Sequence, residues 1–233
     1  SAKPISYGAP ACLSDVSGAA PVPPSCPEIS TTSAWAFDTP AATVPTLRFN
    51  EKREAVLSAA AALFDAHGVK GATLADIAAS VGLVTNSVTY YYRKKEDLAL
   101  ACFDRAVARF DALARDASDA SAVPSRVHRF LASVVDHQLD VARGRQAPIV
   151  SFNDIRALPS PQVERVFAAY TDMFRRVRGL LQGPETAHLS RADLNARAHI
   201  LLSVTHGMRA LLPRYELDER QLGAQRVGDV LVH

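Results

Sequence analysis

The stretch of residues 73–98, TLADIAASVGLVTNSVTYYYRKKEDL, constrains the fold of this chain most strongly, because it contains a helix with signals at both ends. Thr73 and Asp76 match a capping box, in which each side chain bonds a backbone amide of the first turn. Gly82 marks the end of the helix, since a residue without Cβ adopts the left-handed conformation at low cost. Between these signals, one face carries apolar residues at i, i+3, i+4 and i+7: Leu74, Ile77, Ala78 and Val81.

A second short helix is expected to begin at about Val84 or Thr85. Val88 and Tyr92, four residues apart, define its buried edge. Two helices joined by a Gly turn form the outline of a helix-turn-helix. The motif alone leaves two interpretations open, a DNA-binding unit and a solvated helical hairpin of an ordinary all-α domain.

The face of the second helix that points away from its buried edge is polar and suits the reading of DNA bases. Asn can bond the edge of adenine with two hydrogen bonds, a Thr methyl can contact thymine, and Tyr and Arg can reach bases or phosphates. The residues on or beside this face are Asn86, Ser87, Thr89, Tyr90 and Arg93.

The wider stretch of residues 52–103 resembles the tetracycline-repressor (TetR) family of transcriptional regulators. The similarity follows the family's order and register throughout the stretch. The residues that carry it are Lys52-Arg53, VLSAAAALFDAHG (56–68), ATLADIA (72–78), Gly82-Leu83, VTYYY (88–92) and KEDL (95–98). The resemblance implies an all-α fold, with a three-helix helix-turn-helix DNA-binding domain at residues 47–98. A helical domain for effector binding and dimerisation is implied at residues 99–233.

Two positions depart from the family's pattern. Val84 stands where the family commonly has a Ser or similar cap, which weakens the start of the second helix by about 0.5–2 kcal/mol if nothing else caps it. Thr89 stands where the family commonly has the first of two aromatic residues. Tyr90, Tyr91 and Lys95 match positions that contact bases or phosphates in relatives. The resulting hypothesis divides the roles as follows: Thr85, Asn86 and Tyr90 read bases, while Thr73, Tyr91, Arg93 and Lys95 hold phosphates.

The composition sets limits on the class of protein. The chain has 233 residues, 48% of them hydrophobic, and a net charge of +2. This balance does not by itself indicate nucleic acid, because a DNA binder needs only local basic clusters. No apolar run approaches the roughly 18 residues that span a bilayer, and no basic region followed by an apolar one marks a secretory signal. The sequence therefore predicts a cytoplasmic protein with no membrane association.

The first 46 residues differ in composition from the rest of the chain, since they hold eight of the fourteen prolines and only four charged residues. Such a segment does not form long helices, and we expect a flexible extension. Ile29, Trp35 and Phe37 could anchor it on its own dimer or on a partner. Cys12 and Cys26 in this segment could have a redox role, whereas Cys102 is expected in a helix core.

Helical patterns continue to the end of the chain. The first helix should begin with Asn50 as its cap and end at Gly68, and a helix after Leu98 should extend to about Ala117 as the family's connecting helix. No strand pattern and no internal repeat is present. Five further helices are expected at about residues 124–144, 148–158, 161–183, 190–212 and 218–232.

Catalytic and metal-binding signals are sparse in the second half of the chain. Asp136, His137 and Asp140 fall on neighbouring turns of one helix, but a metal site needs three or four converging ligands. No nucleophile motif such as G-x-S-x-G is present. The sequence therefore predicts no enzyme, no metal and no cofactor.

The helices after residue 118 carry large apolar faces with a few polar groups, a composition that suits either a plain core or a ligand pocket. The family resemblance implies an effector pocket between these helices. The candidate lining residues are Phe130, Val134, His137, Phe152, Asn153, Arg156, Phe167, Tyr170, Phe174 and His206. Of these, His137, Asn153, Arg156 and His206 would orient a polar end of the ligand.

The last two helices carry more apolar surface than a monomer leaves exposed, which predicts a homodimer. Two-fold symmetry then predicts a palindromic double-stranded DNA operator. The function predicted from the sequence is a repressor that a small, largely apolar effector releases from this operator. Two alternatives stay open: an activator or ligand-independent regulator, and a protein-interaction dimer with a vestigial helix-turn-helix.

Overall fold

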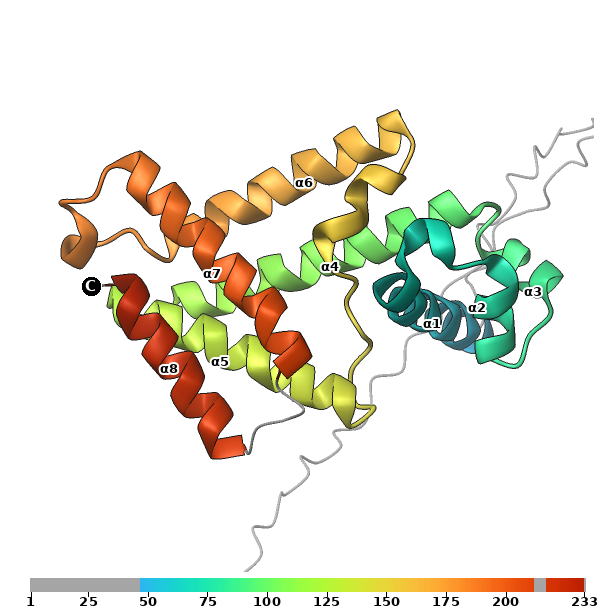
Figure 1. Ribbon diagram of the computed structural model, residues 1–233, viewed down its shortest axis with the longest axis horizontal. Coiled ribbons are helices and arrows are strands. Elements are labelled where there is room, and N and C mark those ends of the chain that lie inside the picture. Colours follow the sequence, from blue (N-terminus) through green and yellow to red (C-terminus); the bar gives the residue numbers. More distant parts are fainter. Residues whose placement is uncertain (1–46, 212–216, 233) are drawn as a thin grey trace, which may run out of the picture. The chain divides into compact units, whose positions relative to one another are not determined.

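Eight α-helices and two short 3-10 helices follow one another along residues 47–211 and 217–232, which are the residues that the computed structural model describes (Figure 1). These residues contain no strand, and the all-α fold predicted from the sequence is confirmed. The predictions for residues 1–46, including the anchor residue Trp35, lie outside the described residues. The helices are α1 (Leu47–Gly71), α2 (Leu74–Ser80), α3 (Thr85–Tyr91), α4 (Lys95–Ser118), α5 (Val123–Ala142), η1 (Phe152–Ala157), α6 (Ser160–Gly179), η2 (Pro184–Thr186), α7 (Arg191–Leu211) and α8 (Leu217–Val232).

Helices α1, α2 and α3 enclose a small core of their own. Val56 and Phe64 of α1 are buried, as are Ile77 of α2 and Val88 of α3. Such a core fixes α3 on α1 and α2, because closely packed side chains resist displacement.

Helix α1 begins at Leu47, so the prediction that Asn50 caps this helix is wrong. The additional turn brings Phe49 against Tyr90 and Tyr91, with ring centroids 5.8 and 5.0 Å away. This contact involves residues far apart in the sequence, and helix-end signals do not report it. The predicted end is confirmed, because Gly68 interrupts the helix with φ +73°.

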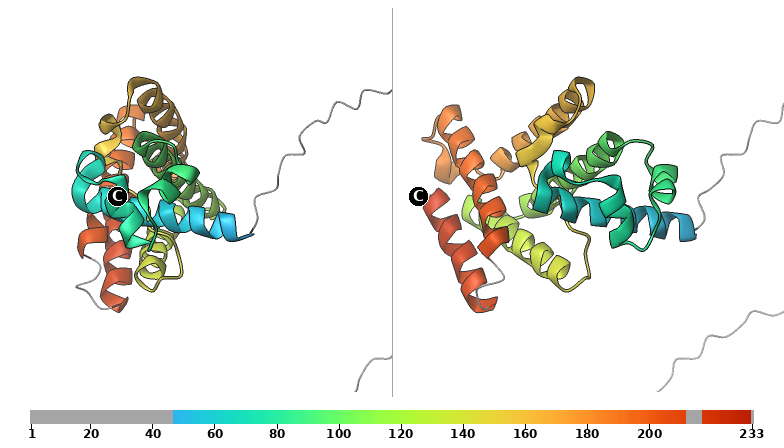
Figure 2. Two further views of the ribbon diagram at one scale, coloured as in Figure 1. Left: turned by 90° about the vertical axis from the view of Figure 1, so that its right-hand side faces the viewer. Right: turned by 45° about the vertical axis from the view of Figure 1, so that its right-hand side comes forward.

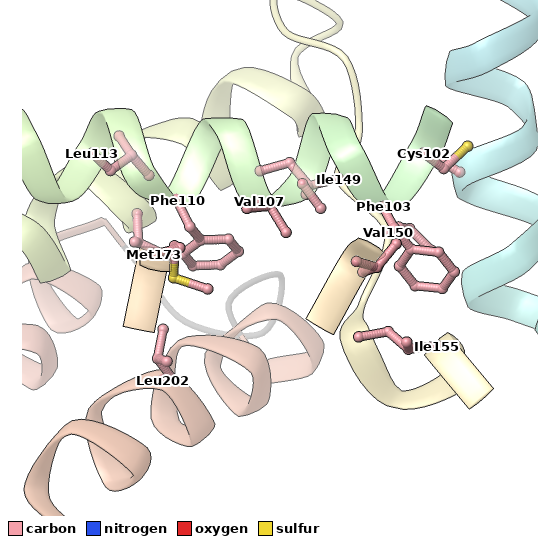
Figure 3. Packing of buried hydrophobic residues seen from close by; sticks show 14 of the residues in the cluster. Cys102, Phe103, Val107, Phe110, Leu113, Ile149, Val150, Ile155, Met173 and Leu202 are labelled. Atoms are coloured by element: carbon pink, nitrogen blue, oxygen red, sulfur yellow. The ribbon is translucent and has the colours of Figure 1, made fainter. Parts of the chain in front are cut away.

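Helix α4 contacts α1, α5 and α6 and so joins the first three helices to the rest of the chain. Figure 3 shows Phe103 beside Val150 and Ile155, and Phe110 pointing toward Met173. Cys102 is buried on the same helix, as predicted, and burial raises the pKa of its thiol to about 12. It is therefore a neutral, apolar core residue at physiological pH.

The helix predicted at residues 148–158 is replaced by an extended segment followed by the 3-10 helix η1. The backbone of the extended segment bonds side chains of distant helices instead of its own neighbours. The Pro148 carbonyl accepts a hydrogen bond from Arg105 (2.9 Å), and the Ser151 N–H donates one to Asp65 (2.7 Å). These contacts satisfy groups that a helix would otherwise have satisfied.

The last three α-helices follow the predicted order with small changes at their ends. Helix α6 ends at Gly179 instead of continuing to residue 183, and the short helix η2 follows. Helix α8 lies against α5 (Figure 2), and a Cβ atom at Gly228 would come within 2.2 Å of the His128 ring. Within residues 47–211 and 217–232, no helix is both long and apolar enough to cross a membrane.

Candidate DNA-binding surface and effector cavity

The capping box predicted for α2 is present. The Thr73 hydroxyl accepts a hydrogen bond from the Asp76 N–H (3.1 Å), and the Asp76 carboxylate accepts bonds from the Thr73 N–H (3.1 Å) and hydroxyl (2.7 Å). These bonds hold the pKa of Asp76 below its ordinary value. The box fixes the start of α2, and Gly82, with φ +65°, reverses the chain after it.

Helix α3 begins at Thr85 without a side-chain cap, because Val84 offers no polar atom to the first turn. Two buried side chains hold the helix instead, Val88 and Tyr92. The Arg53 guanidinium lies 5.4 Å from the centre of the Tyr92 ring and adds a cation–π contact. These buried side chains, together with the contact between Arg53 and Tyr92, therefore take the place of the missing cap.

The outward face of α3 is polar, as its sequence indicates. Thr85, Asn86 and Tyr90 are exposed, and 73% of Tyr90 is accessible to solvent. Thr89 is half-buried and donates its hydroxyl to the Asn86 carbonyl at 2.9 Å, so this hydroxyl is turned toward its own helix. Arg93 follows the helix and is exposed, whereas Ser87 and Tyr91 are half-buried.

An aromatic cluster of Phe49, Tyr90 and Tyr91 lies beside the outward face of α3. The part that Phe49 plays in it was not predicted. Phe49 of α1 contacts both tyrosines of α3, whose own rings lie 5.4 Å apart. Edge-to-face and tilted rings at these distances attract one another. Phe49 thus limits the positions open to Tyr90 and Tyr91.

Lys95 lies at the start of α4 and reaches back to the end of α1. Its ammonium group donates hydrogen bonds to the carbonyls of Lys70 (3.2 Å) and Ala72 (3.1 Å). The charge is therefore held directly beside Thr73, the cap of α2. A cation fixed in this position can meet a phosphate without first losing side-chain freedom.

The end of α1 is also bonded to η1, a contact that the sequence did not predict. The Asp154 carboxylate accepts a hydrogen bond from the Val69 N–H at 2.5 Å. A Cβ atom at Gly68 would lie 3.1 Å from the same carboxylate oxygen. Gly68 is thus required both by its positive φ and by the approach of Asp154.

Arg105 of α4 ties the same region together. Its guanidinium forms an ion pair with Glu54 and donates to the Ser58 hydroxyl (3.2 Å) and the Leu57 carbonyl (3.2 Å), all on α1. It also donates to the Pro148 carbonyl (2.9 Å), just before η1. One side chain therefore links α1, α4 and the segment leading to η1.

A cavity of about 290 Å³ lies between η1, α6 and α7. Of the ten predicted pocket residues, Phe152, Asn153, Tyr170 and His206 line it. Leu202 completes the buried part of the lining, and His199 and Ser203 are exposed. The lining residues from α7 recur at i, i+3, i+4 and i+7 from His199. Starting from His206, this helical spacing could have revealed His199, Leu202 and Ser203, which were not predicted.

Aromatic rings form much of the cavity wall. The Phe152 ring centroid lies 5.1 Å from that of Tyr170 and 5.6 Å from that of His206, both in edge-to-face geometry. The His206 ring is also stacked on Phe110 at 5.7 Å. Burial raises the pKa of the Tyr170 hydroxyl, which keeps this group neutral.

The remaining predicted pocket residues lie elsewhere on α5, η1 and α6. Phe130 and Val134 are buried, and His137 is buried with its Nδ1 accepting a hydrogen bond from Arg109 at 3.3 Å. Arg156 is exposed. The six residues outside the cavity lining are Phe130, Val134, His137, Arg156, Phe167 and Phe174. Among the described residues, no group of three or more His, Cys, Asp or Glu side chains could hold a metal ion.

The first helices also match a known sequence family. Residues 56–102 fit the model of bacterial regulatory proteins of the tetR family. Residues 56–102 therefore form a DNA-binding domain of the TetR type. This helix-turn-helix domain supports a role as a DNA-binding transcriptional regulator. No curated protein matches the chain.

Solved structures, among them two TetR-family regulators, share the fold beyond the helix-turn-helix. A regulator from Rhodococcus RHA1 is 22% identical, with a TM-score of 0.62, over 78% of this chain and 95% of its own. A regulator from Bordetella parapertussis 12822 has the same coverage and TM-score at 20% identity. AibR in complex with isovaleryl coenzyme A and operator DNA is 17% identical, with a TM-score of 0.55, over 78% of this chain and 96% of its own.

Proposed function

We propose that this TetR-family protein is a repressor that leaves a palindromic operator when a small effector fills the cavity between η1, α6 and α7. One observation carries the proposal. Four consecutive residues, 151–154, serve two sites at once: Phe152 and Asn153 line the cavity, while Ser151 and Asp154 bond α1. An occupant that moves the cavity wall therefore acts on the helix that supports α3.

On the DNA side, exposed side chains of α3 enter the major groove in this proposal. Thr85, Asn86 and Tyr90 contact bases, where Asn86 is suited to adenine. Thr73, Tyr91, Arg93 and Lys95 hold phosphates on either side of the groove, and Ser87 and Thr89 lie beside the reading face. The contacts to phosphate set the register, and those to base edges supply specificity.

A homodimer through α7 and α8 would present two such faces. One stripe of α7 is exposed and consists of small or apolar residues together with polar ones: Ala196, His199, Ile200, Ser203 and Gly207. On α8, Leu222 and Val230 are exposed as well. Leu201 and Leu231 are buried within the protomer and belong to its core. Burying the exposed apolar side chains in a second copy is the favourable choice, and a two-fold dimer then matches a palindrome.

Coupling between the cavity and DNA then requires only a small difference in energy. Effectors typically change the affinity of a second site by about 1–3 kcal/mol, which is about 5–150-fold. The structurally similar AibR has been seen with both isovaleryl coenzyme A and operator DNA. By analogy, the cavity here and the surface of α3 would be two sites of one regulated protein.

The first test is selection of bound DNA from a random pool with the purified full chain, followed by affinity measurements at several salt concentrations. We expect a palindromic sequence whose affinity falls steeply with salt, because several phosphates are neutralised. The absence of any enriched palindrome would contradict the proposal.

Variants then separate the roles of the side chains. Asn86→Ala is expected to weaken the selected site by about 1–3 kcal/mol and to relax the choice of one base pair. Arg93→Ala should weaken all sequences alike and reduce the salt slope by about 1. Arg175→Ala is the matched control, because Arg175 is an exposed arginine of α6 paired only locally with Asp172. Unchanged binding in Asn86→Ala and Arg93→Ala would remove both from the reading surface.

A further inference from the structure

We propose that the cavity takes a compact, uncharged ligand with a planar aromatic ring and one hydroxyl or N–H group that donates a hydrogen bond to Nε2 of His206. This inference rests on the proposed function, since it names the chemical class of the effector. It depends on the charge of the cavity lining, on the geometry of its rings and on one buried polar atom, Nε2 of His206, that has no hydrogen-bond partner among the described residues.

The lining excludes a charged ligand. None of the seven lining residues is Asp, Glu, Lys or Arg. A carboxylate or phosphate placed there would lose hydration without gaining a Lys or Arg partner, which is costly in a partly apolar site. Because burial raises the pKa of Tyr170, its hydroxyl stays neutral and offers no negative charge to a cationic ligand. A neutral ligand meets neither penalty.

The rings of the lining favour a flat ligand of limited size. Phe152, Tyr170 and His206 present ring faces and edges that already pack on one another at centroid distances of 5.1 and 5.6 Å. A further planar ring can join such a group in stacked or edge-to-face contact. The volume of about 290 Å³ lies at the small end of the range for ligand pockets, which is about 300–1,000 Å³.

His206 supplies the polar requirement. Its Nδ1 lies 2.7 Å from the Leu202 carbonyl, which can only accept, so Nδ1 carries the proton. In the neutral ring, Nε2 is then an acceptor. This atom is buried and has no hydrogen-bond partner among the residues that the structure describes. A buried acceptor left unpaired is unfavourable, so a ligand that donates a hydrogen bond to it removes that cost.

The exposed side of the cavity completes the description of the ligand. Asn153, His199 and Ser203 line the cavity and are accessible to solvent. A second polar group on the ligand can form hydrogen bonds with the side chains of these residues. The ring system therefore occupies the part formed by Phe152, Tyr170, Leu202 and His206.

The test uses calorimetric titration of the purified full chain with three probes of one ring system: 2-naphthol, 2-methoxynaphthalene and 2-naphthoate. The first donates a hydrogen bond, the second does not, and the third is an anion. We expect 2-naphthol to bind about tenfold or more tightly than either of the others, the typical effect of one buried hydrogen bond. Equal affinities, tighter binding of 2-naphthoate, or binding of none of the three would overturn the proposal.

Two variants assign the preference to His206. In His206→Phe, 2-naphthol should lose its advantage over 2-methoxynaphthalene, while the latter still binds. His206→Gln keeps an acceptor at this position and should restore part of the preference, which separates hydrogen bonding from simple loss of folding. His188→Gln, at an exposed histidine outside the lining, is the matched control. A preference for 2-naphthol that persists in His206→Phe would contradict the role of Nε2.

Operator affinity measured in the same samples distinguishes this inference from the proposed function. Operator binding without any binding of 2-naphthol would overturn the ligand class and leave the DNA-binding role intact. Binding of 2-naphthol with no change in operator affinity would leave the ligand class intact and overturn the effector role. Loss of operator affinity on adding 2-naphthol supports both.

Discussion

The two ends of α1 are held in different ways. At its N-terminal end, Phe49 contacts the rings of Tyr90 and Tyr91 through apolar surfaces only. At its C-terminal end, the Val69 N–H donates to Asp154 and the Lys70 carbonyl accepts from Lys95, and Gly68 adopts a positive φ. Ring contacts tolerate small shifts, whereas hydrogen bonds weaken steeply when their geometry changes.

The difference indicates which end responds to the cavity and which end serves DNA. The directional contacts lie beside η1, whose neighbouring residues line the cavity, and the adjustable contacts lie beneath the reading face of α3. Under the proposed function, a displacement of η1 would be transmitted at the C-terminal end of α1. The N-terminal end would let the tyrosines adjust to DNA. The following substitutions test this division, beginning with the largest expected effect.

Gly68→Ala should lower the free energy of unfolding by about 2 kcal/mol or more. A left-handed backbone costs an L residue about 1–2 kcal/mol, and the new Cβ would lie 3.1 Å from the Asp154 carboxylate. Urea denaturation measures the change. Gly144→Ala is the control, since Gly144 has a similar φ of +69° and nothing within 4 Å of a Cβ. Equal losses in the two variants would show that the contact with Asp154 has no energetic weight.

Asp154→Ala should cost about 1–3 kcal/mol, because the Val69 N–H then loses its partner in a partly buried site. In this background, Gly68→Ala and Gly144→Ala should become equally destabilising, which a double-mutant cycle measures. Asp172→Ala serves as the control, since its carboxylate is 73% exposed and pairs only with Arg175. An excess for Gly68→Ala that survives without Asp154 would place the strain elsewhere.

Lys95→Met should lower stability by about 1 kcal/mol and also weaken operator binding. The substitution removes the donor to the carbonyls of Lys70 and Ala72 while keeping an unbranched side chain. The control is Lys70→Met, which removes an exposed charge from the last turn of α1, where Lys95 binds. It should change stability by less than about 0.5 kcal/mol. If the two variants weaken binding to the same extent, Lys95 contributes only general charge and no positioned contact.

Phe49→Ala should lower stability by about 0.5–1.5 kcal/mol, the usual worth of one aromatic contact, which is similar to the effect of Lys95→Met. We expect a clear loss of operator affinity, because Tyr90 and Tyr91 lose their support. Leu47→Ala is the matched variant, since Leu47 begins the same helix and is 76% exposed. Fluorescence anisotropy with operator DNA provides the comparison. Loss of affinity in Leu47→Ala equal to that in Phe49→Ala would mean that the helix end, and not the ring, matters.

Local signals in the sequence predicted the first part of the fold well. The capping box of Thr73 and Asp76, the chain reversal at Gly82 and the buried pair Val88 and Tyr92 all depend on residues within a few positions of one another. Each of these patterns has one dominant structural solution. For this reason the helix-turn-helix could be placed without knowledge of the rest of the chain.

Contacts between distant residues explain what the sequence did not predict. Asp154 bonds a backbone group 85 positions earlier, and Ser151 bonds a side chain 86 positions earlier. These partners hold residues 148–151 extended where the apolar pattern favoured a helix. The cavity likewise combines η1, α6 and α7, so the sequence anticipated Phe152, Asn153, Tyr170 and His206 but not the three lining residues His199, Leu202 and Ser203. Phe130 and Val134 have the apolar character expected of lining residues but are buried on α5.

The bond between Val69 and Asp154 limits how regulators of this kind can be recombined. A helix-turn-helix domain from another protein would pack against η1 of this chain only under two conditions. It would need a glycine at the position of Gly68 and an unpaired backbone N–H at the position of Val69. Conversely, a C-terminal domain without a carboxylate at the position of Asp154 would accept the helix-turn-helix domain of this chain but would leave the Val69 N–H unpaired. A chimeric sensor made by joining two proteins at α4 must therefore also match at this second contact. Its two residues, Val69 and Asp154, lie 85 positions apart in the sequence.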